Sequence, residues 1–126
     1  MAPAAPWLGL WLLEDGENRT LGCVRIHEPE DEAATCELTY LLDPTAWGRG
    51  LATRMARAAI ARAFARGADS VLAGIDGPNT ASLAVVRRLG MRFLRDADYP
   101  AGPGVEYVLA RVDFEALDED RIPFAD

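Results

Sequence analysis

The stretch Asp43-Pro44-Thr45-Ala46-Trp47-Gly48-Arg49-Gly50-Leu51-Ala52 decides how this chain folds. An apolar segment, Cys36 to Leu42, leads into it, and an Ala- and Arg-rich segment with helical periodicity, Leu51 to Arg66, follows it. A strand, a glycine turn and a helix in this order direct several backbone N–H groups and the positive end of the helix dipole at one point. The stretch is therefore either a site for an anionic group such as a phosphate or a plain strand-to-helix turn.

Upstream of this stretch, the sequence predicts three strands, over 7–14, 20–27 and 34–42. The segment Asp15-Gly16-Glu17-Asn18 has the composition of a hairpin turn, and Glu28 to Ala33 reads as an acidic loop. Because the connections are short, we expect an antiparallel meander.

Downstream of the stretch, the hydrophobic period changes to that of a helix. One face of this helix collects the apolar residues Ala52, Ala56, Ala59, Ile60, Ala63 and Phe64. Gly67 stands at the C-cap position, and Ser70 to Ile75 is a short apolar strand. A strand, a helix and a strand in this order predict a right-handed crossover between two parallel strands.

The rest of the chain predicts a second helix, two strands and an acidic tail, over about 79–90, 91–99, 105–113 and 115–126. Asn79 or Thr80 has the side chain of a helix N-cap, and a Pro/Gly loop over 100–104 separates the two strands. The predicted order is βββ-α-β-α-ββ, which makes a mixed α/β sheet in a single domain.

Composition excludes several classes of function. The net charge is −7, which disfavours nucleic acid as a partner, and all 13 cationic residues are Arg, which excludes lysine chemistry. The chain has no apolar run long enough to cross a membrane, and its first residues carry no positive charge, so we expect a cytoplasmic protein. Cys23 and Cys36 lack metal-ligand spacing; they are predicted to be free thiols, with a disulfide between adjacent strands as the alternative.

Two motifs resemble the GNAT acetyltransferase superfamily. The residues from Glu37 to Pro44, followed by Trp47 to Thr53, resemble the branch that includes the ribosomal-protein N-terminal acetyltransferases. Further on, Asn79-Thr80-Ala81-Ser82 and Arg88-Leu89-Gly90-Met91 are similar to that family's Asn-x-x-Ser helix and Leu-Gly-Phe segment, with Met91 in place of Phe. The resemblance spans about 20–113, with an acyl-CoA-binding core over about 36–95.

The resemblance implies an acetyl-CoA-dependent N-acetyltransferase that transfers an acetyl group to an amine by direct attack on the thioester. It implies that the strands before and after the first helix diverge, that pantetheine lies between them and that the pyrophosphate sits on the glycine turn. The residues that would contact the acyl donor are Tyr40, Leu41, Leu42, Trp47, Gly48, Arg49, Gly50, Leu51, Ala52, Thr53, Asn79 and Ser82.

Catalysis needs an oxyanion donor and a base for the amine. A backbone N–H near Leu41 or Leu42 is placed to stabilise the oxyanion, and Glu37 is the candidate base. His27 and Glu28, at the end of the neighbouring strand, are alternatives for moving a proton.

The acid for the departing thiolate is less apparent. Many members of the family carry a Tyr where this chain has Val86, and Ser82 is a candidate substitute, directly or through water. This departure leaves open a second interpretation, a non-catalytic CoA-binding or interaction module.

The family usually begins with one strand and one or two helices that this chain does not contain before its meander. Those elements form much of the acceptor pocket, so we expect a homodimer or a partner that covers the exposed face. The expected small-molecule partners are acetyl-CoA and an amine acceptor.

Overall fold

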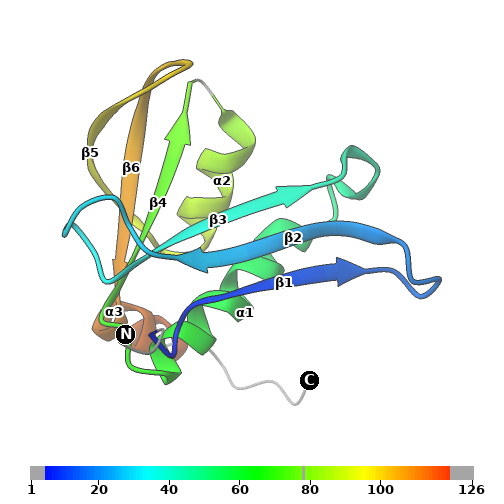
Figure 1. The fold of residues 1–126 in the computed structure, drawn as a ribbon, viewed down its shortest axis with the longest axis horizontal. Helices are drawn as coiled ribbons and strands as arrows, with labels where there is room; N and C mark the ends of the chain where they lie inside the picture. The colour runs from blue at the N-terminus through cyan, green and yellow to red at the C-terminus, as the bar shows by residue number, and fades with distance from the viewer. Residues whose placement is uncertain (1–4, 78, 120–126) are drawn as a thin grey trace.

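The computed structural model describes residues 5–77 and 79–119, which fold into a six-stranded sheet with helices on one face (Figure 1). The elements, in chain order, are β1 (Gly9–Glu14), β2 (Thr20–His27), β3 (Cys36–Leu42), the short 3-10 helix η1 (Pro44–Ala46), α1 (Leu51–Ala65), β4 (Ser70–Asp76), α2 (Thr80–Arg88), β5 (Arg92–Tyr99), β6 (Gly102–Ala110) and α3 (Arg111–Glu119). The predicted order βββ-α-β-α-ββ is confirmed up to β6.

The strands are arranged in the order β1-β2-β3-β4-β6-β5, and β3 and β4 are its parallel neighbours. The antiparallel meander of β1, β2 and β3 is confirmed. The β3–β4 ladder contains only three pairs, from Cys36 opposite Val71 to Leu38 opposite Ala73. Beyond Leu38 and Ala73 the two strands diverge, which leaves a gap between residues 39–42 and residues 74–76 (Figure 1).

The core lies between one face of the sheet and the helices. It joins Cys36 and Leu38 of β3 to the apolar side of α1, on which Ala56, Ala59, Ile60, Ala63 and Phe64 are all buried, as the sequence predicts. The opposite face carries no helix of the described residues, and it presents alternate strand residues that include Glu37, Thr39, Gly74 and Glu106. We call this second surface the open face.

The C-terminal part differs from the prediction. The last strand ends at Ala110 rather than Asp113, and α3 occupies residues 111–119, where the sequence predicted the end of a strand and the start of an acidic tail. The ring of Phe114 packs against Phe64 of α1 with centroids 5.3 Å apart, a tertiary contact that anchors this helix. The predicted 100–104 loop is also shorter, because β6 begins at Gly102, and the tail residues 120–126 lie outside the described part of the chain.

Both cysteines are free thiols, as predicted, but they do not lie on adjacent positions. Cys23 faces Leu41 across the β2–β3 pair, whereas Cys36 faces Val71 of β4. Cys36 is fully buried, and burial raises the pKa of its thiol to about 12. None of the described helices is long and apolar enough to cross a membrane.

Candidate active site

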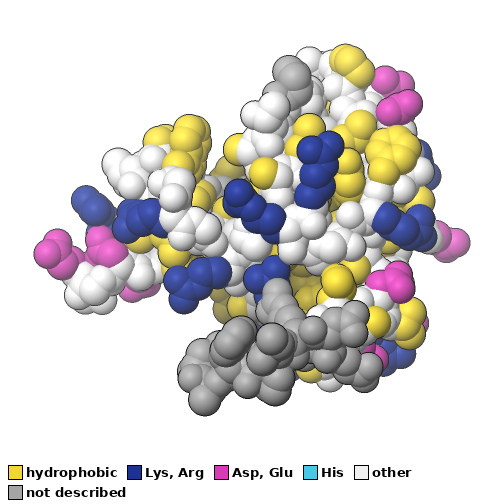
Figure 2. Space-filling model, turned by 180° about the vertical axis from the view of Figure 1, so that it is seen from behind, with side chains coloured by type: hydrophobic (Ala, Val, Ile, Leu, Met, Phe, Trp, Pro, Cys, Tyr) yellow, Lys and Arg dark blue, Asp and Glu magenta, His cyan; other side chains and the backbone are white. Residues whose placement is uncertain are grey.

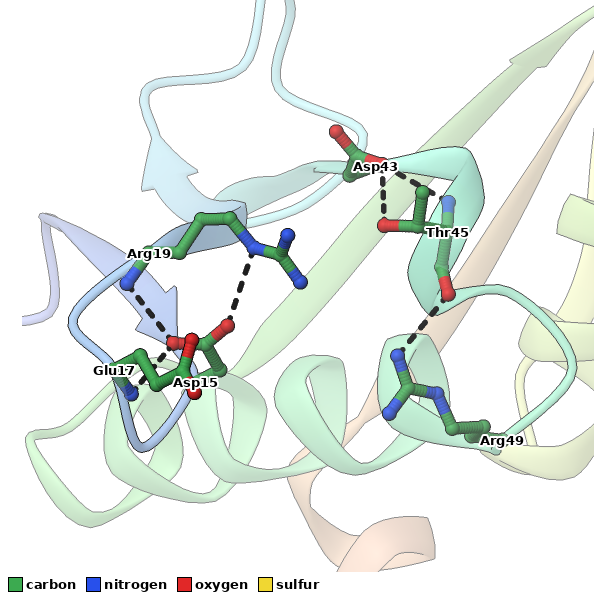
Figure 3. Close-up of polar contacts among 6 residues, drawn as sticks. All are labelled: Asp15, Glu17, Arg19, Asp43, Thr45 and Arg49. Atoms are coloured by element: carbon green, nitrogen blue, oxygen red, sulfur yellow. Dashed lines mark hydrogen bonds and ion pairs between the residues drawn. The ribbon is translucent and has the colours of Figure 1, made fainter.

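The loop between β3 and α1 is held in shape by its own side chains (Figure 3). The Asp43 carboxylate accepts hydrogen bonds from the backbone N–H of Thr45, at 2.9 Å, and from its hydroxyl, at 2.7 Å. The Arg49 guanidinium donates to the Thr45 carbonyl at 3.1 Å, and the Trp47 indole donates to the Leu42 carbonyl at 2.9 Å. These bonds fix the path of the chain into α1, and the bonds from Thr45 lower the pKa of Asp43.

The start of α1 has the properties of an anion site. Gly48 and Gly50 have φ angles of +79° and +72°, which glycine adopts without strain, and open space surrounds both Cα atoms. Gly50 is the N-cap and has no side chain to cap the helix, so the first N–H groups keep no intrahelical acceptor. The Thr53 hydroxyl is buried and has no hydrogen-bond partner among the described residues. Unsatisfied donors around an open cradle fit a pyrophosphate.

The surface formed by α1 and α2 is basic although the whole chain is acidic. The helices α1 and α2 contain five arginines and no Asp or Glu; the arginines are Arg54, Arg57, Arg62, Arg87 and Arg88. Figure 2 shows basic side chains gathered on this side of the molecule. This positive surface suits a ligand with several phosphates.

Strand alternation decides which backbone groups of β3 face the gap. The N–H of Asp43 donates to the Leu21 carbonyl of β2 at 2.7 Å, and Leu41 lies directly opposite Cys23. Successive residues of a strand point their backbone N–H and C=O groups in opposite directions. The backbone groups of Leu41 therefore face β2, and the backbone groups of Leu42 face the gap. Of the two backbone donors that the sequence suggested, Leu42 is therefore the one available at the gap.

Side chains from β3 and α2 meet on the helix side of the gap. The hydroxyls of Tyr40 and Ser82 lie 3.0 Å apart, within hydrogen-bond distance. Asn79 is the N-cap of α2, and its side chain accepts from the Ser82 N–H at 3.0 Å. Val86 is buried in the core at 2% exposure, so the position where the family often has a Tyr holds no polar group here.

Glu37, the predicted base, lies on the open face at the closed end of the gap. Burial raises the pKa of its carboxyl, and the negative charges of Glu106, Glu30 and Asp31 raise it further, against a lowering by His27. A carboxylate with a raised pKa is a better proton acceptor than an exposed one.

His27 lies opposite Glu37 on β2, but both of its ring nitrogens are engaged. Nδ1 lies 3.0 Å from the Glu28 carbonyl and Nε2 lies 2.7 Å from the Thr39 hydroxyl. A carbonyl only accepts, so Nδ1 carries a proton and donates it to the Glu28 carbonyl, while Nε2 is paired with the Thr39 hydroxyl. Both ring nitrogens of His27, beside Glu37, thus already have hydrogen-bond partners.

A further ion-pair cluster, which the sequence did not suggest, crosses the open face. Arg95 of β5 bonds to both Asp31, in the β2–β3 loop, and Glu106 of β6. It ties the acidic loop to the sheet, close enough for both carboxylates to raise the pKa of Glu37. The surroundings of Glu37 are accordingly negative.

Tyr99 was also not singled out by the sequence. Its side chain lies over Gly74 of β4 and Gly104 of β6. A glycine inside a strand can indicate that another group approaches the backbone closely, and these two glycines are the sequence signal for this contact. Arg54, in the first turn of α1, lines an apolar groove of about 480 Å³ between β1 and α1, with Trp11, Leu13 and other residues.

The comparisons with known proteins agree with this geometry. A family model described as "Acetyltransferase (GNAT) domain" matches residues 2–92. The chain is 35% identical over 105 residues to a mycothiol acetyltransferase of Salinispora tropica; the alignment covers 77% of this chain and 34% of that protein. The chain thus spans about a third of the length of this curated relative.

Solved structures have the same fold. The ribosomal-protein-S5-alanine acetyltransferase of Vibrio fischeri matches with a TM-score of 0.76 and 18% identity, over 86% of this chain and 64% of that chain. A spermidine N-acetyltransferase of Vibrio cholerae matches with a TM-score of 0.75 and 13% identity, over 86% of this chain and 69% of that chain. The family match, the fold and the glycine loop together establish that this chain belongs to the GNAT acetyltransferase domain family.

Proposed function

We propose that the protein is an acetyl-CoA-dependent N-acetyltransferase that transfers an acetyl group to an amine by direct attack on the thioester. The observation that carries this proposal is the position of the β3–β4 gap. An uncapped helix start with a buried, unpaired Thr53 hydroxyl lies on one side of it, and Glu37 lies on the other. One ligand that passes through the gap would meet both.

In this proposal the helix side binds the acyl donor. The N–H groups of Gly48, Gly50 and the first turn of α1, with the Thr53 hydroxyl, hold the pyrophosphate. The polar backbone groups of β3 that face the gap pair with the pantetheine arm, and the Leu42 N–H stabilises the developing oxyanion. Support comes from the uncapped helix start and from the basic surface of α1 and α2.

The open face takes the acceptor. An amine arrives as an ammonium ion, which the acidic surroundings of Glu37 attract, and it loses one proton to water to become a neutral nucleophile. Glu37 removes the second proton, which the nitrogen loses as the amide bond forms. The nitrogen forms a bond to the carbonyl carbon, the carbon–sulfur bond breaks, and the thiolate leaves. Cys36 is no candidate for an acyl-enzyme, because its thiol is buried with a pKa of about 12.

The names of the relatives define the acceptors to test. They mention a ribosomal-protein alanine, spermidine and mycothiol. The experiment measures free-thiol release from acetyl-CoA with an alanine-initiated peptide, a polyamine and an amino thiol, beside the shift in melting temperature that acetyl-CoA causes. Turnover of one acceptor and a saturable thermal shift support the proposal, whereas no shift with acetyl-CoA or CoA contradicts it.

A second candidate function is a CoA-binding module without catalysis. The apolar, buried Val86 at the position where the family often has its acid favours this alternative. A thermal shift without turnover on any acceptor is the result that distinguishes it.

We also propose that the protein works in the cytoplasm, as a homodimer or with a partner that covers part of the open face. The exposed leucines of this face, Leu10, Leu12 and Leu41, support association.

A further inference from the structure

The Tyr99 side chain lies flat on the open face, across two neighbouring strands. A Cβ atom at Gly74 would lie 2.2 Å from the Tyr99 hydroxyl oxygen, and one at Gly104 would lie 2.7 Å from two carbons of its ring. Neither distance is possible for a real Cβ, so a side chain at Gly74 or Gly104 would displace the Tyr99 ring; at Gly104 it would also meet the Ile75 carbonyl. Gly74 and Gly104 thus form a shallow cradle for the Tyr99 side chain, which reaches from β5 across β6 to β4.

This cradle brings the hydroxyl to the gap. Gly74 directly follows Ala73, the last residue of β4 that pairs with β3. It shares the open face with Leu72, which lies opposite Glu37. The hydroxyl of Tyr99 thus lies where the two strands begin to separate, on the same face as Glu37.

On the open face of the gap, Tyr99 supplies a hydroxyl that is free to act. Thr39 is engaged with His27, and Tyr40 and Ser82 bond to each other on the helix side. No residue within 5–77 and 79–119 forms a hydrogen bond with the Tyr99 hydroxyl, although its side chain is partly buried. Burial raises the pKa of Tyr99, and the charges of Glu106, Glu37 and Asp76 raise it further, so the phenol keeps its proton at neutral pH.

We propose that Tyr99 is the general acid of this chain, with its hydroxyl donating to the departing sulfur from the cradle formed by Gly74 and Gly104. The inference rests on the proposed acetyl transfer. When the carbon–sulfur bond breaks, its electron pair stays on sulfur, which takes the phenolic proton of Tyr99. Glu37 meanwhile holds the proton lost by the amine, and exchange with water restores both side chains. The hydroxyl supplies the function that the buried Val86 does not.

The test compares wild type with Tyr99→Phe. We expect Tyr99→Phe to lower kcat by about 10²-fold, since a positioned acid contributes on the order of 10² to 10⁴. The thermal shift caused by acetyl-CoA should stay the same, because the phenol acts on the leaving group. Tyr107→Phe is the matched control: Tyr107 lies on the other face of β6, edge-on to Phe93 at 6.0 Å, and its loss should leave kcat unchanged.

The second variant tests the cradle. Gly74→Ala puts a methyl group against the hydroxyl oxygen, so it should lower kcat to nearly the same extent as Tyr99→Phe. In the double variant Gly74→Ala/Tyr99→Phe that clash is gone, and the remaining contact, 3.2 Å to ring carbon Cζ, needs only a small shift. The double variant should therefore be no slower than Tyr99→Phe alone. Circular dichroism checks that all variants are folded.

The pH dependence gives a further readout. In wild type kcat should fall at a pH above 10.0, the ordinary phenol pKa, and Tyr99→Phe should lack this decrease. A Tyr99→Phe enzyme with wild-type kcat, or additive losses in the double variant, would overturn the inference and leave the proposed function intact. A wild-type protein that neither binds nor uses acetyl-CoA would overturn both.

Discussion

The surroundings of Glu37 lower the stability of the folded protein at neutral pH and make its carboxylate a stronger base. Its pKa is raised in the folded state, first by burial and then by the neighbouring carboxylates. A group with a raised pKa stabilises the fold fully only below its unfolded-state value, here about 4.5, and that contribution is lost as the pH rises through the folded-state pKa. At neutral pH the ionised Glu37 therefore destabilises the protein, and the same environment makes it a stronger base.

Glu37→Gln separates these two effects. We expect kcat/KM for the amine to fall by about 10²–10⁴-fold and the acidic limb of its pH profile to disappear. The melting temperature at pH 7 should rise above that of wild type, and the difference should vanish below about pH 4.5. Glu17→Gln, on the β1–β2 turn, is the control and should change neither quantity. Wild-type kcat/KM in Glu37→Gln would contradict the assignment of the base.

Among the elements, the start of α1 carries the strongest prediction. Gly50→Ala forces a side chain into a backbone with φ +72°, which costs about 1–2 kcal/mol and disturbs the cradle for the phosphates. We expect a lower free energy of unfolding in urea and a smaller thermal shift with acetyl-CoA. Gly16→Ala, also with open space around it but without a positive φ, should leave both unchanged. An equally strong response to acetyl-CoA in Gly50→Ala would argue against this site.

The docking of α3 is a separate prediction. Phe114→Ala removes the ring that packs on Phe64, and we expect it to lower the free energy of unfolding by about 1–3 kcal/mol, less than for a fully buried ring. Val112→Ala, at a residue with 66% exposure on the same helix, should change it by less than about 0.5 kcal/mol. Equal effects of the two substitutions in urea unfolding would mean that the ring contact does not hold α3.

The elements that the sequence predicted are those whose signals are local. The apolar face of α1, with Ala56 and Ile60, and the glycines at either end need no knowledge of the rest of the fold. α3 was missed because its position depends on Phe114 meeting Phe64, fifty residues earlier. Tyr99 was missed for a similar reason: its place at the gap depends on glycines from two other strands.

For the whole molecule, the two faces of the sheet differ in charge and in cover. The helix side is basic over α1 and α2, whereas the open face combines the carboxylates near Glu37 with the exposed leucines of β1 and β3. This division matches a phosphate-bearing donor on one side and a cationic acceptor on the other.

The exposed leucines also lead to a prediction about association. We expect wild type to sediment or scatter light as a dimer at micromolar concentration, and Leu12→Asp to shift it to the monomer. Val112→Asp places the same charge at an equally exposed apolar site on α3 and should leave the dimer intact. A monomeric wild type would contradict association through this face.

The central claim is that the glycine loop and the first turn of α1 bind the phosphates of the acyl donor while the β3–β4 gap takes its arm. Titration of the ¹⁵N-labelled protein with acetyl-CoA, followed by NMR, tests it most directly. We predict saturable shifts of the amides of Gly48, Gly50, Leu51, Ala52 and Thr53, together with Leu42 at the gap. Amides at these positions that do not move at saturating acetyl-CoA, or shifts confined to another face of the molecule, would contradict the account.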